Sequence, residues 1–163
     1  MKILIVFYSL TGNTRKIAEA VASATSGEMM EIKTVKEIPT TGFMKFWVGG
    51  KQVVQRELPE LLPFEKNPND FDFIFLGTPI WAANFVPAVR SFLKQAKLQN
   101  KKIALFCIHG GDDPGQAFVN LEEELLGREI VGKIDFKMDA ISEEQLLENL
   151  QKAAEWARHT LAK

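Results

Sequence analysis

Three short segments of the chain combine hydroxyl, amide, glycine and aromatic residues in a way that is typical of a ligand-binding site. They are Ser-Leu-Thr-Gly-Asn-Thr at residues 9–14, Gly-Thr-Pro-Ile-Trp-Ala-Ala-Asn at residues 77–84 and His-Gly-Gly-Asp-Asp-Pro-Gly at residues 109–115. Each follows a run of apolar residues that is typical of a buried strand. Ligands of an open parallel sheet lie beyond the carboxyl ends of its strands, so we expect the three segments to converge on one site.

The first segment has the chemistry of an anion site. Its hydroxyls can donate hydrogen bonds, Gly12 permits a tight turn, and Asn13 or Thr14 can cap a helix that begins near Arg15. The free N–H groups and the positive dipole end of such a helix favour a phosphate without any lysine. The same residue types also suit a plain strand-to-helix turn with a capping residue, so both interpretations stay open for this segment alone.

The chain lacks the residues that other classes of phosphate-binding or phosphate-transferring protein need. The chain has neither G-x-G-x-x-G nor G-x-x-x-x-G-K-[ST]. Ser9 and Arg15 have the spacing of the tyrosine-phosphatase loop, but a serine without a neighbouring base is a poor replacement for the thiolate nucleophile. Tyr8, Ser9, Gly77 and Thr78 stand where a receiver domain needs its acidic residues and its phospho-acceptor aspartate.

Composition bounds the class of protein further. The 163 residues suit one domain, 1–163, and 20 Lys and Arg against 21 Asp and Glu give a net charge of −1, which offers no broad basic field for nucleic acid. The single cysteine, Cys107, rules out a disulfide framework and a cysteine-rich metal site, and we predict no metal. No apolar run reaches the roughly 20 residues of a membrane helix, and the run at residues 3–8 is too short for a signal peptide. We therefore expect a soluble, cytoplasmic protein that binds no membrane.

Apolar runs that alternate with helical patterns predict the elements that position the three segments. We expect five strands, at residues 3–8, 30–32, 73–76, 103–108 and 130–138. The helix boundaries are indicated by Gly27, Pro87, Gly127 and a capping box of Ser142 and Gln145. Strands that alternate with helices indicate an α/β domain with a mostly parallel sheet and helices on both faces.

The first segment directly after an N-terminal strand, together with Gly-Thr-Pro-Ile-Trp at residues 77–81 after the third strand, resembles the flavodoxin-like FMN-binding proteins. The resemblance covers essentially the whole chain. It implies a flavodoxin-like three-layer sandwich, whose five-stranded parallel sheet has the order 2-1-3-4-5. It also implies that FMN binds with its phosphate in the first segment and its ring between the second and third.

The resemblance assigns this cofactor site residue by residue. The first segment would hold the phosphate, and the second would follow the ribityl chain and the ring, with Trp81 against one ring face unless it is simply a core aromatic. His109 is a candidate for giving a proton to the reduced flavin, or is a strand-end histidine satisfied by the protein. The predicted cofactor-binding residues are Ser9, Leu10, Thr11, Gly12, Asn13, Thr14, Thr78, Pro79, Ile80, Trp81, Ala82, Ala83, Asn84, His109, Gly110, Gly111 and Asp112.

Two features depart from many flavodoxins. The segment after the fourth strand has no aromatic residue, so the second ring face is either open to a substrate or covered from elsewhere. The long excursion at residues 34–63 contains the candidate covers Phe46 and Trp47, which could equally pack a helix onto the sheet. Asp112 and Asp113, if they face the flavin, would lower its potential by disfavouring an anionic reduced form.

The sequence predicts an FMN-binding redox protein that transfers electrons through bound FMN, with a redox protein or a small acceptor such as a quinone as its partner. One alternative is an NAD(P)H-dependent FMN or quinone reductase that transfers hydride; another is a module that binds FMN or phosphate without redox turnover. Charge bears on the choice, because pure carriers are typically strongly acidic. This chain offsets its acidic residues, partly through Lys45, Lys51 and Arg56. The oligomeric state is left open.

Overall fold

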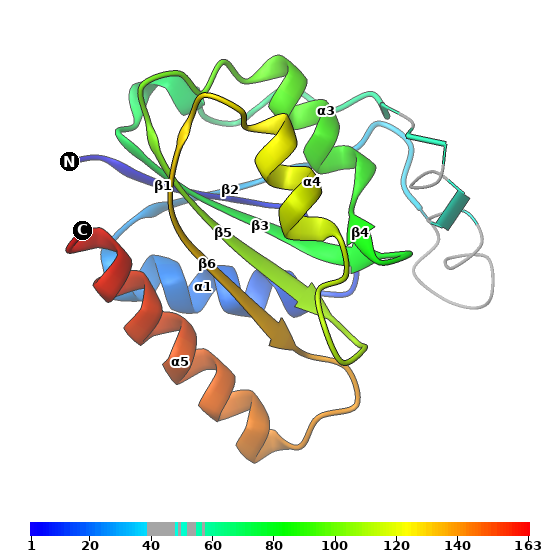
Figure 1. Ribbon diagram of the computed structural model, residues 1–163, viewed down its shortest axis with the longest axis vertical. Coiled ribbons are helices and arrows are strands. Elements are labelled where there is room, and N and C mark those ends of the chain that lie inside the picture. The colour runs from blue at the N-terminus through cyan, green and yellow to red at the C-terminus, as the bar shows by residue number, and fades with distance from the viewer. Residues whose placement is uncertain (39–47, 49, 52–54, 57) are drawn as a thin grey trace.

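The computed structural model of the chain describes residues 1–38, 48, 50–51, 55–56 and 58–163. Their central parallel strands have the order β2-β1-β3-β5-β6 (Figure 1). These strands are β1 (Ile3–Phe7), β2 (Glu28–Glu31), β3 (Phe73–Trp81), β5 (Lys102–His109) and β6 (Glu129–Lys137). Because β5 and β6 are the fourth and fifth parallel strands along the chain, the predicted order 2-1-3-4-5 is confirmed.

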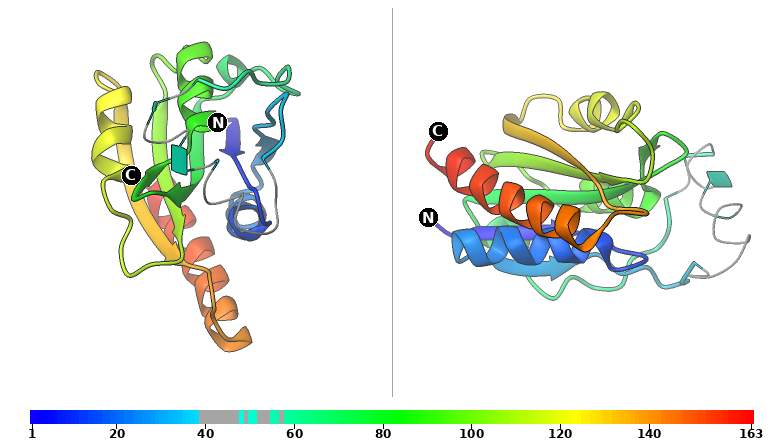
Figure 2. Two further views of the ribbon diagram at one scale, coloured as in Figure 1. Left: turned by 90° about the vertical axis from the view of Figure 1, so that its right-hand side faces the viewer. Right: turned by 90° about the horizontal axis from the view of Figure 1, so that it is seen from below.

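Helices cover both faces of the sheet and make three layers (Figure 2). One face packs against α1 (Asn13–Thr25) and α5 (Glu143–Leu161), the other against α3 (Pro87–Gln95) and α4 (Ala117–Glu124), and the short 3-10 turn η1 (Pro68–Asp70) precedes β3. Successive residues of a strand point to opposite faces, so Leu4 and Val6 enter one core cluster and Ile5 and Phe7 the other. This explains why the sequence of β1 is continuously apolar.

Local capping signals gave most of the helix boundaries correctly. Ser142 and Gln145 form the predicted capping box at the start of α5, and Pro87 is the first residue of α3. The start of α1 differs from the prediction. The helix begins at Asn13, and the residue before it, Gly12, lies in the left-handed region with φ +92° and has no side chain with which to cap the helix. The predicted capping by Asn13 or Thr14 is therefore wrong, and the amide group of Asn13 donates instead to the carbonyl oxygen of Met138 at 3.3 Å.

The third strand is longer than the predicted strand at residues 73–76 and includes the first half of the second polar segment. Strand β3 continues to Trp81, and the chain then turns at two residues and returns as the antiparallel β4 (Asn84–Phe85). Pro79 is tolerated there because the β1–β3 ladder ends at Gly77, so no β1 residue is paired opposite its missing N–H group. On its other side Pro79 lies opposite Ile108 of β5. The first half of the polar segment is thereby part of the sheet, at the carboxyl end of β3.

The long excursion at residues 34–63 is described only in part. Its two ends lie together, because Thr34 and Leu61 form an antiparallel bridge. The predicted covers and one of the basic residues lie outside the described residues: Phe46, Trp47 and Lys45. Among the described residues, none of the helices has the length and the apolar character that a membrane span requires.

Candidate functional site

A cavity of about 330 Å³ opens where β1, β3 and β5 end. Its size lies within the range of roughly 300–1,000 Å³ that is usual for small-molecule sites. The structure brings all three predicted segments to its wall. The predicted residues that line it are Leu10, Thr11, Asn13, Thr14, Pro79, Ile80, Trp81, Ala82, His109 and Gly110.

The other predicted residues lie outside this lining: Ser9, Gly12, Thr78, Ala83, Asn84, Gly111 and Asp112. Several of them hold the backbone instead. The Ser9 hydroxyl accepts a hydrogen bond from the Arg15 N–H at 3.3 Å. The buried Thr78 hydroxyl accepts from the Val86 N–H at 3.3 Å and donates to the Pro79 carbonyl oxygen at 2.8 Å. Such side chains keep the lining residues in place.

The phosphate end of the predicted site fits the N-terminus of α1. The residue before this helix, Gly12, has no side chain with which to cap it, and the Ser9 hydroxyl takes up only the N–H group of Arg15. The first helical residues, Asn13 and Thr14, lie on the cavity wall with Thr11, and a helix N-terminus offers its backbone N–H groups and the positive end of its dipole to an anion. Two threonine hydroxyls add neutral donors, so this donor set suits a phosphate group. Arg15, in the same turn, is engaged outside the lining by an ion pair with Glu31.

The aromatic wall of the cavity is Trp81, which Tyr8 supports. The two rings meet edge to face, with 5.7 Å between their centroids and 85° between their planes. Burial of Tyr8, reinforced by the negative charges of Glu31 and Glu37, raises the pKa of its phenol to about 12. Tyr8 is therefore a neutral aromatic support at physiological pH. Trp81 is half-buried and presents an aromatic group suited to a planar ring.

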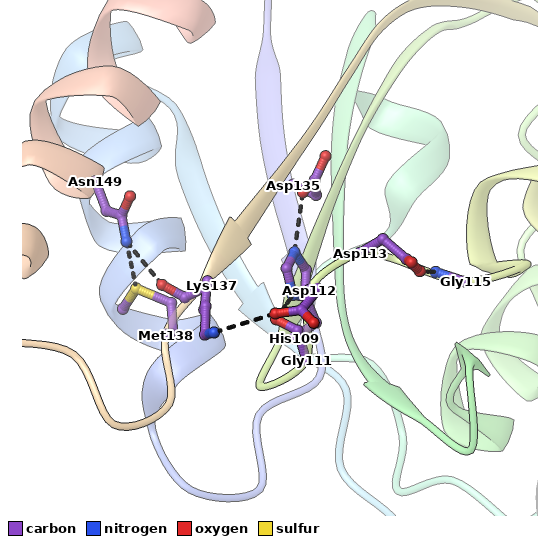
Figure 3. Close-up of polar contacts among 9 residues, drawn as sticks. All are labelled: His109, Gly111, Asp112, Asp113, Gly115, Asp135, Lys137, Met138 and Asn149. Atoms are coloured by element: carbon purple, nitrogen blue, oxygen red, sulfur yellow. Dashed lines mark hydrogen bonds and ion pairs between the residues drawn. The ribbon is translucent and has the colours of Figure 1, made fainter.

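The segment after β5 is fastened to the turn between β3 and β4. The Gln116 N–H donates to the Ala83 carbonyl oxygen at 2.8 Å. Gly115 has φ +58°, and a Cβ atom there would lie 2.5 Å from that same oxygen. The Asp113 carboxylate accepts from the Gly115 N–H at 2.7 Å and closes the turn (Figure 3). Two walls of the cavity are thus joined by direct contact of their backbones.

The acidic residue on the cavity wall is Asp139, which was not predicted. Its carboxylate forms no hydrogen bond or ion pair with any residue that the structure describes, and it lies against Gly110. The predicted charges lie elsewhere: Asp112 is fully exposed, 3.5 Å from the Lys137 ammonium group, and Asp113 is used in its turn (Figure 3). Asp139 follows β6, so the strand-end rule that located the other segments could have found it. Ile108, the other unpredicted lining residue, belongs to the buried run of β5 and carried no polar signal.

The His109 side chain is held by two contacts within the protein. Its Nδ1 lies 3.1 Å from the Gly111 carbonyl oxygen, and its Nε2 lies 2.9 Å from a carboxylate oxygen of Asp135. Both ring nitrogens are thus engaged by the protein. This matches the expectation of a satisfied strand-end histidine better than that of a proton donor to a flavin.

The described residues offer neither a reactive thiol nor a group of side chains that could hold a metal ion. Burial, with a smaller contribution from Asp135, raises the pKa of the Cys107 thiol, so this group stays neutral in its apolar strand. Among the residues that the structure describes, no three His, Cys, Asp or Glu side chains are grouped so that they could hold a metal ion.

Proteins with flavodoxin-like domains are similar to this chain. The flavodoxin-like domain-containing protein BilS of Clostridioides difficile (strain CD3) is 27% identical over 125 residues, or 77% of this chain, and the chain spans 56% of the length of that protein. The crystal structure of a flavoprotein in complex with FMN from Lactobacillus acidophilus NCFM has a TM-score of 0.72 and 23% identity, covering 82% of this chain and 92% of its own. Oxidised flavodoxin 1 from Bacillus cereus has a TM-score of 0.52 and 22% identity, with 98% and 99% covered. The two structures show that the fold is shared.

The family assignment comes from a sequence profile described as flavodoxin, which matches residues 2–153. The matched region includes β1 with its polar segment, the β3–β4 hairpin, the segment after β5, and Asp139 after β6. The match confirms the flavodoxin-like resemblance seen in the sequence and, with it, FMN as the expected cofactor. On its sequence and its fold, the chain belongs to the flavodoxin family.

Proposed function

We propose that this protein binds FMN in the described cavity and transfers electrons through it. The observation that carries the proposal is one cavity whose lining combines two chemistries. The N-terminus of α1 and two threonine hydroxyls supply hydrogen-bond donors, and Trp81 and Ile80 supply aromatic and apolar surface. Bound FMN supplies the electron-accepting ring, and the chain holds and orients it.

The residues divide this work between them. Thr11 and Thr14 donate hydrogen bonds at the phosphate end, assisted by the helix dipole. Trp81, supported by Tyr8, packs against the ring and excludes water from that side. Gly110 presents only its backbone on the wall, because the Asp139 side chain occupies the space in which a Cβ atom would lie. Asp139 places a negative charge on the same wall.

Transfer of hydride from NAD(P)H to FMN or a quinone is the second candidate function. The observation that favours it concerns residues 109–115, of which His109 and Gly110 line the cavity: this segment contains no Phe, Tyr or Trp to cover the second ring face. A small planar substrate could then approach that face. The cytoplasmic location and the partners, a redox protein or a small acceptor such as a quinone, remain predictions from the sequence.

Binding is tested by titrating the purified protein with FMN and following the quenching of flavin fluorescence. The matched pair of variants is Thr14→Val, at the cavity end of α1, and Thr25→Val, at the other end of the same helix. A hydrogen bond to a charged group is worth about 1.5–3 kcal/mol, so we expect Thr14→Val to weaken FMN binding roughly ten-fold or more. Thr25→Val, whose hydroxyl bonds only to its own helix, should bind within about two-fold of the wild type.

Redox function is tested on the FMN-loaded protein. An anaerobic reductive titration that proceeds in separate one-electron steps supports the electron carrier. Rapid bleaching of the flavin after stopped-flow mixing with NADPH supports the reductase instead. A protein that binds no FMN refutes both, and one that binds FMN but reacts with neither reductant nor acceptor is a binding module.

A further inference from the structure

The ring of His109 connects a pair of glycines to the edge strand of the sheet (Figure 3). The His109 side chain is 5% exposed, whereas its partner Asp135 is 42% exposed on β6. Gly110 and Gly111 follow directly, and Gly110 lines the cavity. A buried side chain at the end of a central strand thus reaches both the cavity wall and the edge of the sheet.

The parallel register brings the two side chains together. Strands β5 and β6 pair Cys107 with Asp135 and His109 with Lys137. Residues two apart on a strand share a face, so His109 and Asp135 are diagonal neighbours on the face that carries Cys107. The Met138 N–H also donates to the His109 carbonyl oxygen at 3.0 Å, which fixes the backbone at this point. The ring can therefore reach both acceptors from one fixed position.

The donor count explains why an imidazole occupies this position. The Gly111 carbonyl oxygen and the Asp135 carboxylate both accept hydrogen bonds, so each contact needs an N–H group on the ring. A neutral imidazole supplies one N–H group and the imidazolium form supplies two, so the ring donates to both partners at once when both nitrogens carry hydrogen. In that form one rigid ring spans the distance from the edge strand to the glycine pair.

We propose that His109 and Asp135 form a positioning pair that fixes the Gly111–Asp112 peptide and thereby shapes the cavity wall at Gly110. Consecutive glycines have the greatest backbone freedom of any residues, so their conformation needs an external restraint. A trans peptide is planar, so holding the Gly111 carbonyl oxygen against the ring turns the Asp112 N–H to the opposite side. The expected effect of this pair on FMN affinity rests on the proposed function.

The pair is tested through Asp135, because that residue is half-exposed on an edge strand, where a substitution disturbs little of the packed core. Asp135→Leu removes the acceptor, while Asp135→Asn keeps an acceptor oxygen. The control is Glu122→Gln, which breaks the ion pair of Glu122 with Lys133 on the same strand and leaves His109 untouched. The two readouts are the amide resonances of Gly111 and Asp112 in the 15N-labelled FMN-free protein and the Kd for FMN.

We expect Asp135→Leu to move both amide resonances and to weaken FMN binding about three- to ten-fold, the equivalent of one hydrogen bond. Asp135→Asn should restore most of the affinity, and Glu122→Gln should leave both readouts unchanged. Wild-type amide positions and affinity in Asp135→Leu would overturn the proposal. An equal loss of affinity in all three variants would also overturn it, because that indicates a general weakening of β6.

His109→Phe provides a second route, since it keeps a ring of similar shape but has no donor. If it folds, it should show the same amide shifts as Asp135→Leu, and adding Asp135→Leu to it should change affinity no further. Additive losses in the double variant contradict a shared role. Should the wild-type protein fail to bind FMN, the proposed function fails, while the amide resonances still decide whether the pair fixes the peptide.

Discussion

Gly115 lies where the segment after β5 approaches the β3–β4 turn closely. Its replacement by alanine tests how rigidly the two cavity walls are joined. A Cβ atom at this position would lie 2.5 Å from the Ala83 carbonyl oxygen and 2.8 Å from the Ala83 Cβ. Neither atom belongs to the end of a flexible side chain. Gly115→Ala must therefore push one wall away from the other.

The expected cost has two parts. Alanine in the left-handed region, at φ +58°, costs about 1 kcal/mol. Separation of the walls also loses the hydrogen bond from the Gln116 N–H to Ala83, worth about 1 kcal/mol, with some loss of contact besides. We expect the free energy of unfolding to fall by roughly 2–3 kcal/mol. FMN affinity should fall by about ten-fold, because Ala82 in the same turn lines the cavity.

Urea unfolding, followed by tryptophan fluorescence, measures the first effect and FMN titration the second. The matched control is Gly127→Ala, since Gly127 has φ +80° but no atom within 4 Å of an added Cβ. It should lose only the conformational part, about 1 kcal/mol, and should bind FMN like the wild type. Equal losses of stability in the two variants would refute the reasoning, because the contact with Ala83 would then contribute nothing.

Two further predictions concern charge. Asp139→Asn removes the carboxylate on the cavity wall and should raise the reduction potential of bound FMN. The expected effect is on the order of 1 kcal/mol, or about 40 mV for one electron, measured by potentiometric titration. An unchanged potential would show that the Asp139 charge does not act on the flavin. For Glu124, burial opposes ionisation, but hydrogen bonds from Lys94 and Arg90 hold its pKa below the usual 4.5. Because the pKa of Glu124 is lower in the folded protein, its ionised form stabilises the fold above pH 4.5, and this stabilisation is lost as the pH falls through the folded-state pKa. Glu124→Gln should therefore lower the free energy of unfolding in urea by about 2 kcal/mol at pH 7 and by much less at pH 3. A loss that does not depend on pH contradicts the ion pair.

Local patterns in the sequence were sufficient for the architecture. Continuous apolar runs predicted the buried parallel strands, and the capping box at Ser142 located the start of α5, because both depend on residues close together in the chain. The rule that ligands lie beyond the carboxyl ends of parallel strands then predicted that three distant segments would meet. Tyr8, directly before the first segment, and Trp81, in the second, are in ring contact.

Other features depend on which strand is the neighbour. Strand β3 continues through Pro79 because β1 stops pairing at Gly77, and no pattern within residues 77–84 contains that information. Likewise, the partner of His109 is Asp135, which is 26 residues away and adjacent only through the register of β5 and β6. The sequence by itself thus determined most of the elements and the segments that form the site, and its family resemblance implied the strand order. Only the tertiary structure decided which side chains line the cavity and which support it, because that division depends on contacts between segments far apart in the chain.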